Sequence, residues 1–240
     1  YVELEAKLDF WLKHNLNVLL VGDGGVGKTA LIKQAFKNAG MKHPSENPGP
    51  NDKIYLYYST PTTDPWVDFV GVPKEVKKDN GTSYLDLIRP AIFENPNIEA
   101  VYLDELNRSK DKVRDACMEL IQFKSINGKK LPNLKVVWAA INPEDDPLYQ
   151  VQSLDFAQKD RFHVYYEIPN NVSYSFFENK FGEKVATAAT NWWIQLEDNL
   201  RKKVSPRRLE YALDMFVIGG DIRDVLPKEI NASKLLLDLR

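Results

Sequence analysis

The chain of 240 residues has little cysteine and little histidine, with one cysteine, Cys117, and three histidines. A single cysteine cannot form a disulfide within the chain, and this usage favours a reducing compartment such as the cytoplasm. The histidines, His14, His43 and His163, are scattered and lack the paired spacing of a metal site. We therefore expect neither disulfides nor a histidine-based metal centre.

The sequence also lacks long hydrophobic runs and a strong excess of charge of either sign. No apolar stretch approaches the roughly 18 residues that span a bilayer, and the N-terminus has no apolar signal core, so we predict a cytoplasmic protein without membrane insertion. Lysine and arginine total 32 against 34 aspartates and glutamates, a net charge of -2. This balance gives the chain no bulk attraction to nucleic acid.

Short apolar runs alternate with segments of helical spacing up to about residue 169. The predicted strands are 17–21, 53–59, 100–103, 134–141 and 162–168, and the predicted helices are 3–14, 28–39, 84–93, 110–123 and 154–159. This alternation indicates a parallel sheet covered by helices on both faces, an α/β fold. Within residues 125–131, Asn127-Gly128 predicts a β-hairpin.

The pattern changes after residue 169, where strands stop and helical spacing continues over 176–201, 206–217 and 232–239. We therefore predict two domains, an α/β domain over residues 1–169 and a small all-helical domain over residues 170–240.

One glycine-rich segment follows the first predicted strand and opens the next helix. Gly22-Asp23-Gly24-Gly25-Val26-Gly27-Lys28-Thr29 fits the pattern G-x-x-x-x-G-K-[ST] in the strand–loop–helix context that this motif requires. Glycines let successive backbone N–H groups curl around phosphate oxygens, and the helix contributes its positive end. We predict that these residues and Ala30 bind a nucleotide, with Lys28 on the β- and γ-phosphates and Thr29 on Mg²⁺.

A second candidate site lies where the predicted strand 100–103 ends in two acids, Asp104 and Glu105. Parallel α/β sheets bind ligands at the carboxyl ends of their strands. Asp104 is predicted to hold Mg²⁺, usually through water, and Glu105 to orient or deprotonate a water that attacks the γ-phosphate.

Together these motifs resemble those of the AAA+ ATPases, and within them the MoxR-like group. The resemblance covers nearly the whole chain, and the order and spacing of the motifs agree with the family. Five further segments carry it: Asp104-Glu105-Leu106-Asn107-Arg108, Ala140-Ile141-Asn142-Pro143, Asp160-Arg161-Phe162, Asp68-Phe69-Val70-Gly71 and Ser205-Pro206-Arg207.

The resemblance implies a P-loop NTPase with a helical lid that hydrolyses ATP with Mg²⁺. It implies roles for three more residues: Asn142 as sensor 1 near the attacking water, Arg161 as an arginine finger for the neighbouring subunit, and Arg207 as sensor 2. Because Arg208 directly follows Arg207, the sequence leaves open which of the two arginines is sensor 2. It further implies a homo-oligomer, a hexameric ring, that remodels or assembles a protein client.

Alternatives remain open at this stage. The family usually has Gly-Pro-Pro-Gly where this loop has Gly-Asp-Gly-Gly, and the charge of Asp23 near the phosphates favours weaker binding or slower turnover. With the short lid, this supports an ATP-dependent assembly module with negligible turnover. A nucleic-acid-associated motor is a third candidate, which the near-neutral charge disfavours. Arg108 is assigned either to a subunit interface or to an ion pair with Asp111.

Overall fold

The computed structural model describes residues 2–145 and 151–239. These residues form two compact units. The larger comprises residues 2–21 and 29–167, and the smaller comprises Gly22–Lys28 and residues 168–239. The domain division between residues 169 and 170 stays a prediction.

The larger unit is built on a six-stranded sheet in which every pair of neighbouring strands is parallel. The order of strands across the sheet is β10-β1-β9-β6-β3-β2. Their bounds are Val18–Val21 for β1, Met41–Lys42 for β2, Lys53–Ser59 for β3, Ile98–Asp104 for β6, Val136–Ile141 for β9 and Val164–Glu167 for β10. The five predicted strands are thus confirmed, and the short edge strand β2 is an addition.

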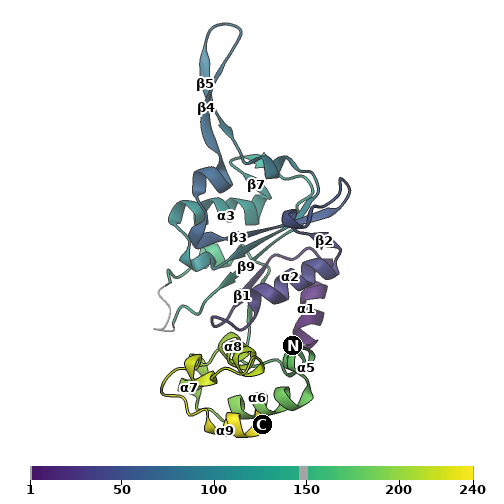
Figure 1. Ribbon diagram of the computed structural model, residues 1–240. Coiled ribbons are helices and arrows are strands. Elements are labelled where there is room, and N and C mark those ends of the chain that lie inside the picture. The colour runs from purple at the N-terminus through teal and green to yellow at the C-terminus, as the bar shows by residue number, and fades with distance from the viewer. Residues whose placement is uncertain (1, 146–150, 240) are drawn as a thin grey trace. The chain divides into compact units, whose positions relative to one another are not determined.

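Helices cover both faces of this sheet (Figure 1). The helices of the larger unit are α1 (Val2–Lys13), α2 (Lys28–Asn38), α3 (Asp111–Phe123) and α4 (Phe156–Lys159). Phe36 of α2 packs against Trp138 of β9 with ring centroids 5.1 Å apart. Side chains alternate along a strand, so Val137 belongs to the opposite face, where it shares a core cluster with Cys117 and Leu120 of α3. Strands that are covered on both faces have continuous apolar sequences, which is why the sequence predicted them correctly.

The C-terminal part of the smaller unit is helical, as predicted. It contains α5 (Tyr174–Phe181), α6 (Glu183–Ile194), α7 (Asp198–Lys203), α8 (Pro206–Val217) and α9 (Ser233–Leu239). The single helix predicted over 176–201 is wrong, because Gly182 at φ 87° ends α5 and the chain restarts as α6. Trp193 anchors this core, fully buried and donating from Nε1 to the carbonyl of Val204 at 2.7 Å.

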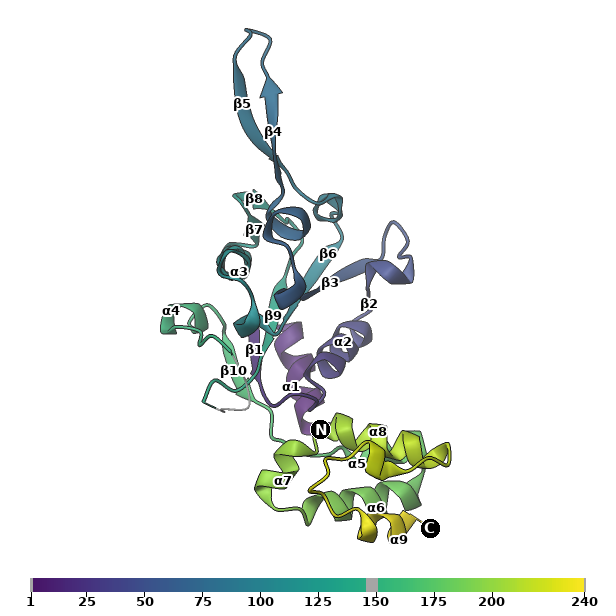
Figure 2. The same cartoon turned by 60° about the vertical axis from the view of Figure 1, so that its left-hand side comes forward.

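The helix predicted over 84–93 is also wrong. The segment forms β5 (Ser83–Ile88), antiparallel to β4 (Val72–Lys77), followed by a 3-10 turn over Ala91–Glu94. The two strands make a hairpin that projects from the rest of the larger unit (Figures 1 and 2). Most residues of the hairpin are exposed on both faces. Neither strand therefore shows the alternation of apolar and polar residues along the sequence that marks a half-buried strand.

The hairpin predicted from Asn127-Gly128 is confirmed. It consists of β7 (Ser125–Ile126) and β8 (Lys129–Lys130), and Asn127 and Gly128 have φ of 49° and 74°. Two consecutive positive φ angles are what a type I′ turn requires.

None of the helices within residues 2–145 and 151–239 has the length and apolar character needed to cross a membrane.

We expect the β4–β5 hairpin to be dispensable for folding, because its residues contribute little to the core. Replacing residues 75–85 by Asn-Gly retains the pairs Val72↔Ile88, Pro73↔Leu87 and Lys74↔Asp86. The thermal midpoint should move by less than about 3 °C, since 1 kcal/mol corresponds to roughly 2–4 °C at this chain length.

As a comparison, Phe69→Ala removes a fully buried ring and should cost about 3–5 kcal/mol of unfolding free energy. An equally large loss in the shortened hairpin would show that the hairpin is part of the folding core.

Candidate functional site

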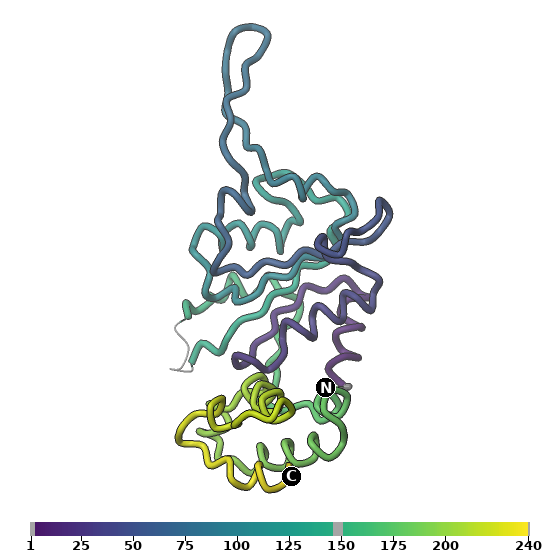
Figure 3. Tube along the Cα trace, in the orientation of Figure 1, coloured from purple at the N-terminus to yellow at the C-terminus, as the bar shows by residue number. Residues whose placement is uncertain are grey.

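The glycine-rich loop Gly22–Lys28 joins β1 to α2, and Figure 3 follows the chain through it. Gly25 and Gly27 have φ of 83° and 92°, a region that favours glycine, so the sequence of the loop suits its path. Lys28 is nearly buried and donates from Nζ to the carbonyl oxygens of Gly22 and, at 2.9 Å, Asp23. The ammonium is thereby held against the turn of the loop.

The two residues predicted to hold Mg²⁺ lie together. Thr29 stands in the first turn of α2 and Asp104 ends β6, 75 residues later in the chain. The Thr29 Oγ1 hydroxyl donates to Asp104 Oδ2 at 2.7 Å. This contact joins the end of the glycine-rich motif to the acidic strand end, while the role of the two residues in holding Mg²⁺ stays a prediction.

This pair offers oxygen ligands suited to a hard cation. Mg²⁺ in proteins is commonly bound through one or two carboxylates together with water and substrate phosphates. One hydroxyl and one carboxylate match the protein part of that donor set. The residues present therefore fit Mg²⁺.

Two tyrosines that were not predicted from the sequence flank Thr29 and Asp104. Tyr57 of β3 donates from its hydroxyl to Asp104 Oδ2 at 3.3 Å, and the Tyr102 hydroxyl lies 3.3 Å from Thr29 Oγ1. Burial, with the nearby Asp104 carboxylate, raises the pKa of Tyr57 to about 12, and burial likewise raises the pKa of Tyr102. Both phenols are therefore protonated at neutral pH and can donate.

The chain turns sharply after Asp104, where Glu105 adopts a left-handed conformation with φ 54°. The Thr60 hydroxyl holds this turn through the carbonyl oxygens of Asp104 and Glu105, each at 3.0 Å. The Glu105 carboxylate is half-exposed and pairs with Arg108 at 3.0 Å.

The sequence left open whether Arg108 pairs with Asp111. The structure answers this part of the question, because Asp111 pairs with Arg114 and Arg108 with Glu105. The proposed general base thus lies in an ion pair.

Asn142 follows β9 and is almost fully buried. Its backbone is fixed by the side chain of Asn107, which donates from Nδ2 to the Asn142 carbonyl at 2.9 Å and accepts from the Asn142 amide at 3.3 Å. Asn107 was part of the motif Asp-Glu-Leu-Asn-Arg, but nothing in the sequence indicated its partner 35 residues away. Its buried amide locks the segment that carries the predicted sensor.

The two predicted arginines make different contacts. Arg161 donates from Nε to Gln122 Oε1 at 3.1 Å and from Nη1 to the carbonyl of Ala157. In the smaller unit, Pro206 begins α8 and Arg207 lies in its first turn, with its backbone amide donating to the carbonyl of Gly25 at 3.2 Å. The roles of Arg161 and Arg207 stay predictions.

The remaining predicted residues belong to the loop and its helix. Val26 is buried, while Asp23 and Gly24 are partly exposed and Ala30 is exposed in the first turn of α2. Their contacts with a nucleotide stay predictions as well.

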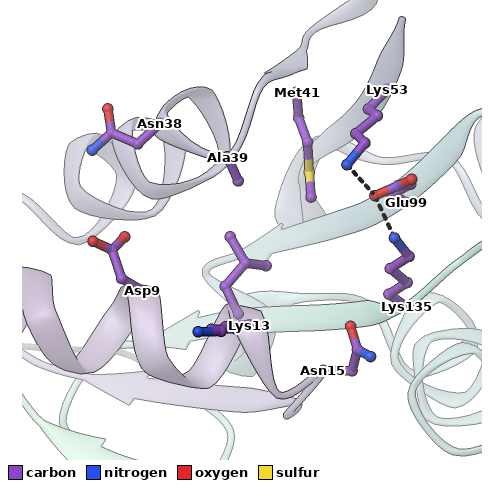
Figure 4. Close-up of a pocket in the computed structure, with 10 residues that line it drawn as sticks. Asp9, Lys13, Asn15, Asn38, Ala39, Met41, Lys53, Glu99 and Lys135 are labelled. Carbon is purple, nitrogen blue, oxygen red and sulfur yellow. Dashed lines mark hydrogen bonds and ion pairs between the residues drawn. The ribbon is translucent and has the colours of Figure 1, made fainter. Parts of the chain in front are cut away.

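A pocket elsewhere in the larger unit contains none of the predicted residues (Figure 4). It lies at the amino ends of the strands, opposite Asp104, and includes Lys53, Glu99 and Lys135. Glu99 is shared between the ammonium groups of Lys53 at 3.8 Å and Lys135 at 2.9 Å. The acidic and basic side chains that line this pocket thus largely compensate one another's charge, so we do not place the functional site there.

The Asn107–Asn142 contact generates a stability prediction. Asn107→Ala should lower the unfolding free energy by about 2–4 kcal/mol, because two buried backbone groups lose these partners. Urea denaturation measures this change.

Asn133→Ala is a matched control, because Asn133 donates from Nδ2 to the Pro96 carbonyl at 2.7 Å on an exposed surface. It should cost about 1 kcal/mol or less. Equal losses in the two variants would contradict the locking role of Asn107.

No family model matches the chain. Two curated proteins are similar to it in sequence. "Structural protein ORF618" of Acidianus two-tailed virus is 32% identical over 149 residues, which cover 61% of this chain and 22% of that protein. "Putative chaperone BssE" of Thauera aromatica is 25% identical over 240 residues, which cover 94% of this chain and 78% of that protein.

Among solved structures, NtrX from Brucella abortus in complex with ADP matches with a TM-score of 0.58 and 12% identity. The match covers 95% of this chain and 53% of that chain. At this level of identity the likeness concerns the fold alone. The six-stranded parallel sheet flanked by helices, with a helical C-terminal region, confirms the predicted α/β fold, which the NtrX structure shares.

Proposed function

We propose that this chain is a MoxR-like AAA+ ATPase that hydrolyses ATP with Mg²⁺, acts as a ring-shaped homo-oligomer and remodels or assembles a macromolecular partner. The observation that carries the proposal is the 2.7 Å contact between Thr29 Oγ1 and Asp104 Oδ2. It joins Thr29, the last residue of the glycine-rich motif, to an acidic strand end. A glycine-rich turn without nucleotide chemistry has no need of that juxtaposition.

In this proposal the residues of the loop bind the phosphates. Backbone amides of Gly22–Thr29 surround the phosphate oxygens, and Lys28 reaches the β- and γ-phosphates from its position against the loop. Mg²⁺, when bound by Thr29 and Asp104, neutralises negative charge on the phosphates.

Hydrolysis further requires a positioned water. Glu105 accepts a proton from that water. To do so, its carboxylate leaves the ion pair with Arg108 and contacts the water instead. Asn142 positions the same water or contacts the γ-phosphate, with its backbone held by Asn107. Arg161 completes the site of a neighbouring subunit, and Arg207 reports the state of the nucleotide to the helical region.

The comparisons support separate parts of the proposal. NtrX shares the fold and was solved with ADP, which supports nucleotide binding. The name of BssE includes the word chaperone, and its similarity to this chain supports a remodelling role here.

A second candidate is an ATP-dependent assembly module with negligible turnover. Two observations favour it: the Glu105 carboxylate is held by Arg108, and the chain is similar to a viral protein named as structural. In this case ATP would stabilise an assembly without being consumed.

Glu105→Gln tests the assignment of the base. We expect turnover to fall by about 10² to 10⁴ while ATP affinity changes by less than about threefold, since a general base acts on the chemical step. Glu99→Gln is the matched control, because Glu99 lies on the same strand near its opposite end.

A normal rate in Glu105→Gln would remove Glu105 from the mechanism. Tight ATP binding with negligible turnover in the wild type would instead favour the assembly module.

Arg161→Ala tests the shared site. Wild-type ATP turnover per protomer should rise with protein concentration, and the variant should lose about 10³-fold or more, the scale known for arginine fingers. Arg223→Ala, which removes a side chain 71% exposed and paired with Asp221, should retain wild-type turnover.

Turnover that does not depend on concentration, together with full activity in Arg161→Ala, would contradict the proposal of a shared site.

A further inference from the structure

Tyr57 and Tyr102 stand side by side on neighbouring strands of the sheet. They are register partners in the β3–β6 pairing, and their ring centroids are 5.5 Å apart with an interplanar angle of 46°. Side chains alternate along a strand, so Tyr102 and Asp104 share one face of β6. The same cluster includes Thr29, at the start of α2.

The hydroxyls of both tyrosines end at the proposed metal ligands. Tyr57 donates to Asp104 Oδ2, which also accepts from Thr29, and the Glu105 amide donates to Asp104 Oδ1 at 3.0 Å. The carboxylate is therefore held at both oxygens. Tyr102 in turn contacts the Thr29 hydroxyl, so that hydroxyl has partners on two sides.

Neutral groups orient the Asp104 carboxylate. The hydroxyls of Thr29 and Tyr57 and the backbone amide of Glu105 donate hydrogen bonds to it. A lysine or arginine at these three positions would compensate the carboxylate charge, whereas these neutral donors orient the carboxylate without compensating its charge.

Tyr57 is itself fixed from the helix side. The Nζ of Lys33 lies 3.8 Å from the centroid of the Tyr57 ring, a cation–π contact. Lys33 stands on α2 four residues after Thr29, one turn along the same helix. The helix that carries Thr29 thus also holds the ring whose hydroxyl orients Asp104.

Tyr102 has a constraint of its own, because its side chain is fully buried. A buried phenol hydroxyl usually finds a hydrogen-bond partner, and a phenylalanine would fill nearly the same space without that need. Within the described chain, the hydroxyl reaches the metal-ligand pair rather than a neighbouring carbonyl.

We propose that Tyr57 and Tyr102 are positioning residues for Mg²⁺, and that their hydroxyls hold Thr29 and Asp104 in the orientation that receives the ion. The proposal rests on the proposed function and deepens it. Mg²⁺ demands near-ideal octahedral geometry, so freedom in a ligand lowers affinity. Removing outer-shell partners of metal ligands typically costs 10–100-fold in metal affinity.

The test measures metal affinity separately from nucleotide affinity. Mn²⁺ binding to the ADP complex is followed by electron paramagnetic resonance, and ADP binding is measured with and without metal. Because both contacts are 3.3 Å long, we expect Tyr57→Phe and Tyr102→Phe to weaken Mn²⁺ binding by about 5–10-fold, at or just below the lower end of the 10–100-fold range. ADP affinity without metal should stay within twofold.

Tyr55→Phe is the matched control. Tyr55 lies two residues before Tyr57 on β3, and its ring packs against Phe36 and His43, away from Asp104. This variant should keep Mn²⁺ affinity within twofold. Lys33→Met retains both tyrosine hydroxyls but removes the cation–π contact with the Tyr57 ring. If the position of that ring matters, Mn²⁺ affinity should fall by a smaller factor, about two- to threefold.

The outcomes separate the two proposals. If the wild type binds MnADP and both phenylalanine variants bind Mn²⁺ as tightly, the positioning role is wrong and the proposed function stands. If the wild type binds no nucleotide with or without metal, the proposed function fails and the inference with it. A variant that loses metal-free ADP binding and stability together would point to a merely structural role and overturn the inference. Tyr57 is only half-buried, so Tyr57→Phe is the variant expected to fold normally.

Discussion

Parallel pairing of the strands is the constraint on which the candidate site depends. In a parallel sheet all carboxyl ends meet at one edge, so residues that follow different strands converge there although they are far apart in sequence. Here that edge brings Asp104 at the end of β6 to the side chain of Thr29, which follows β1 through the glycine-rich loop. Asn142 follows β9, the strand between β1 and β6, and Asn107 secures its backbone. The chemistry proposed for this chain needs this convergence.

Much of this arrangement was predictable, because its strands are buried on both faces and its loops have strong turn chemistry. Continuous apolar runs such as Val18–Val21 and Val136–Ile141 leave little choice of element. The glycine-rich motif specified its own strand–loop–helix context, and Asn127-Gly128 specified its hairpin. The parallel topology placed Asp104 and Thr29 at the same edge of the sheet, whereas the position of β9 between β1 and β6 was not predicted.

Other features were not predictable, for identifiable physical reasons. The β4–β5 hairpin is exposed on both faces, so burial imposes no period on its sequence, and the spacing of Leu85, Ile88 and Ile92 imitated a helix. Contacts of Tyr57, Tyr102 and Asn107 depend on register between strands and on side chains that meet across 35 to 73 residues. Spacing along one segment carries no information about such contacts. The ion pair of Glu105 with Arg108 was within reach of an i, i+3 argument, but a nearby acid, Asp111, offered an equally good partner.

We infer that the glycine-rich motif ending at Thr29 and the acidic strand end at Asp104 serve one Mg²⁺-dependent nucleotide site. Calorimetric titration of ATP into the wild-type chain and into Lys28→Ala, each with and without Mg²⁺, tests it most directly. We predict one ATP per chain, tighter binding in the presence of Mg²⁺, and a loss of at least about tenfold in affinity in the variant, equivalent to about 1.4 kcal/mol. Binding that is absent, indifferent to Mg²⁺ or unchanged by Lys28→Ala would contradict it.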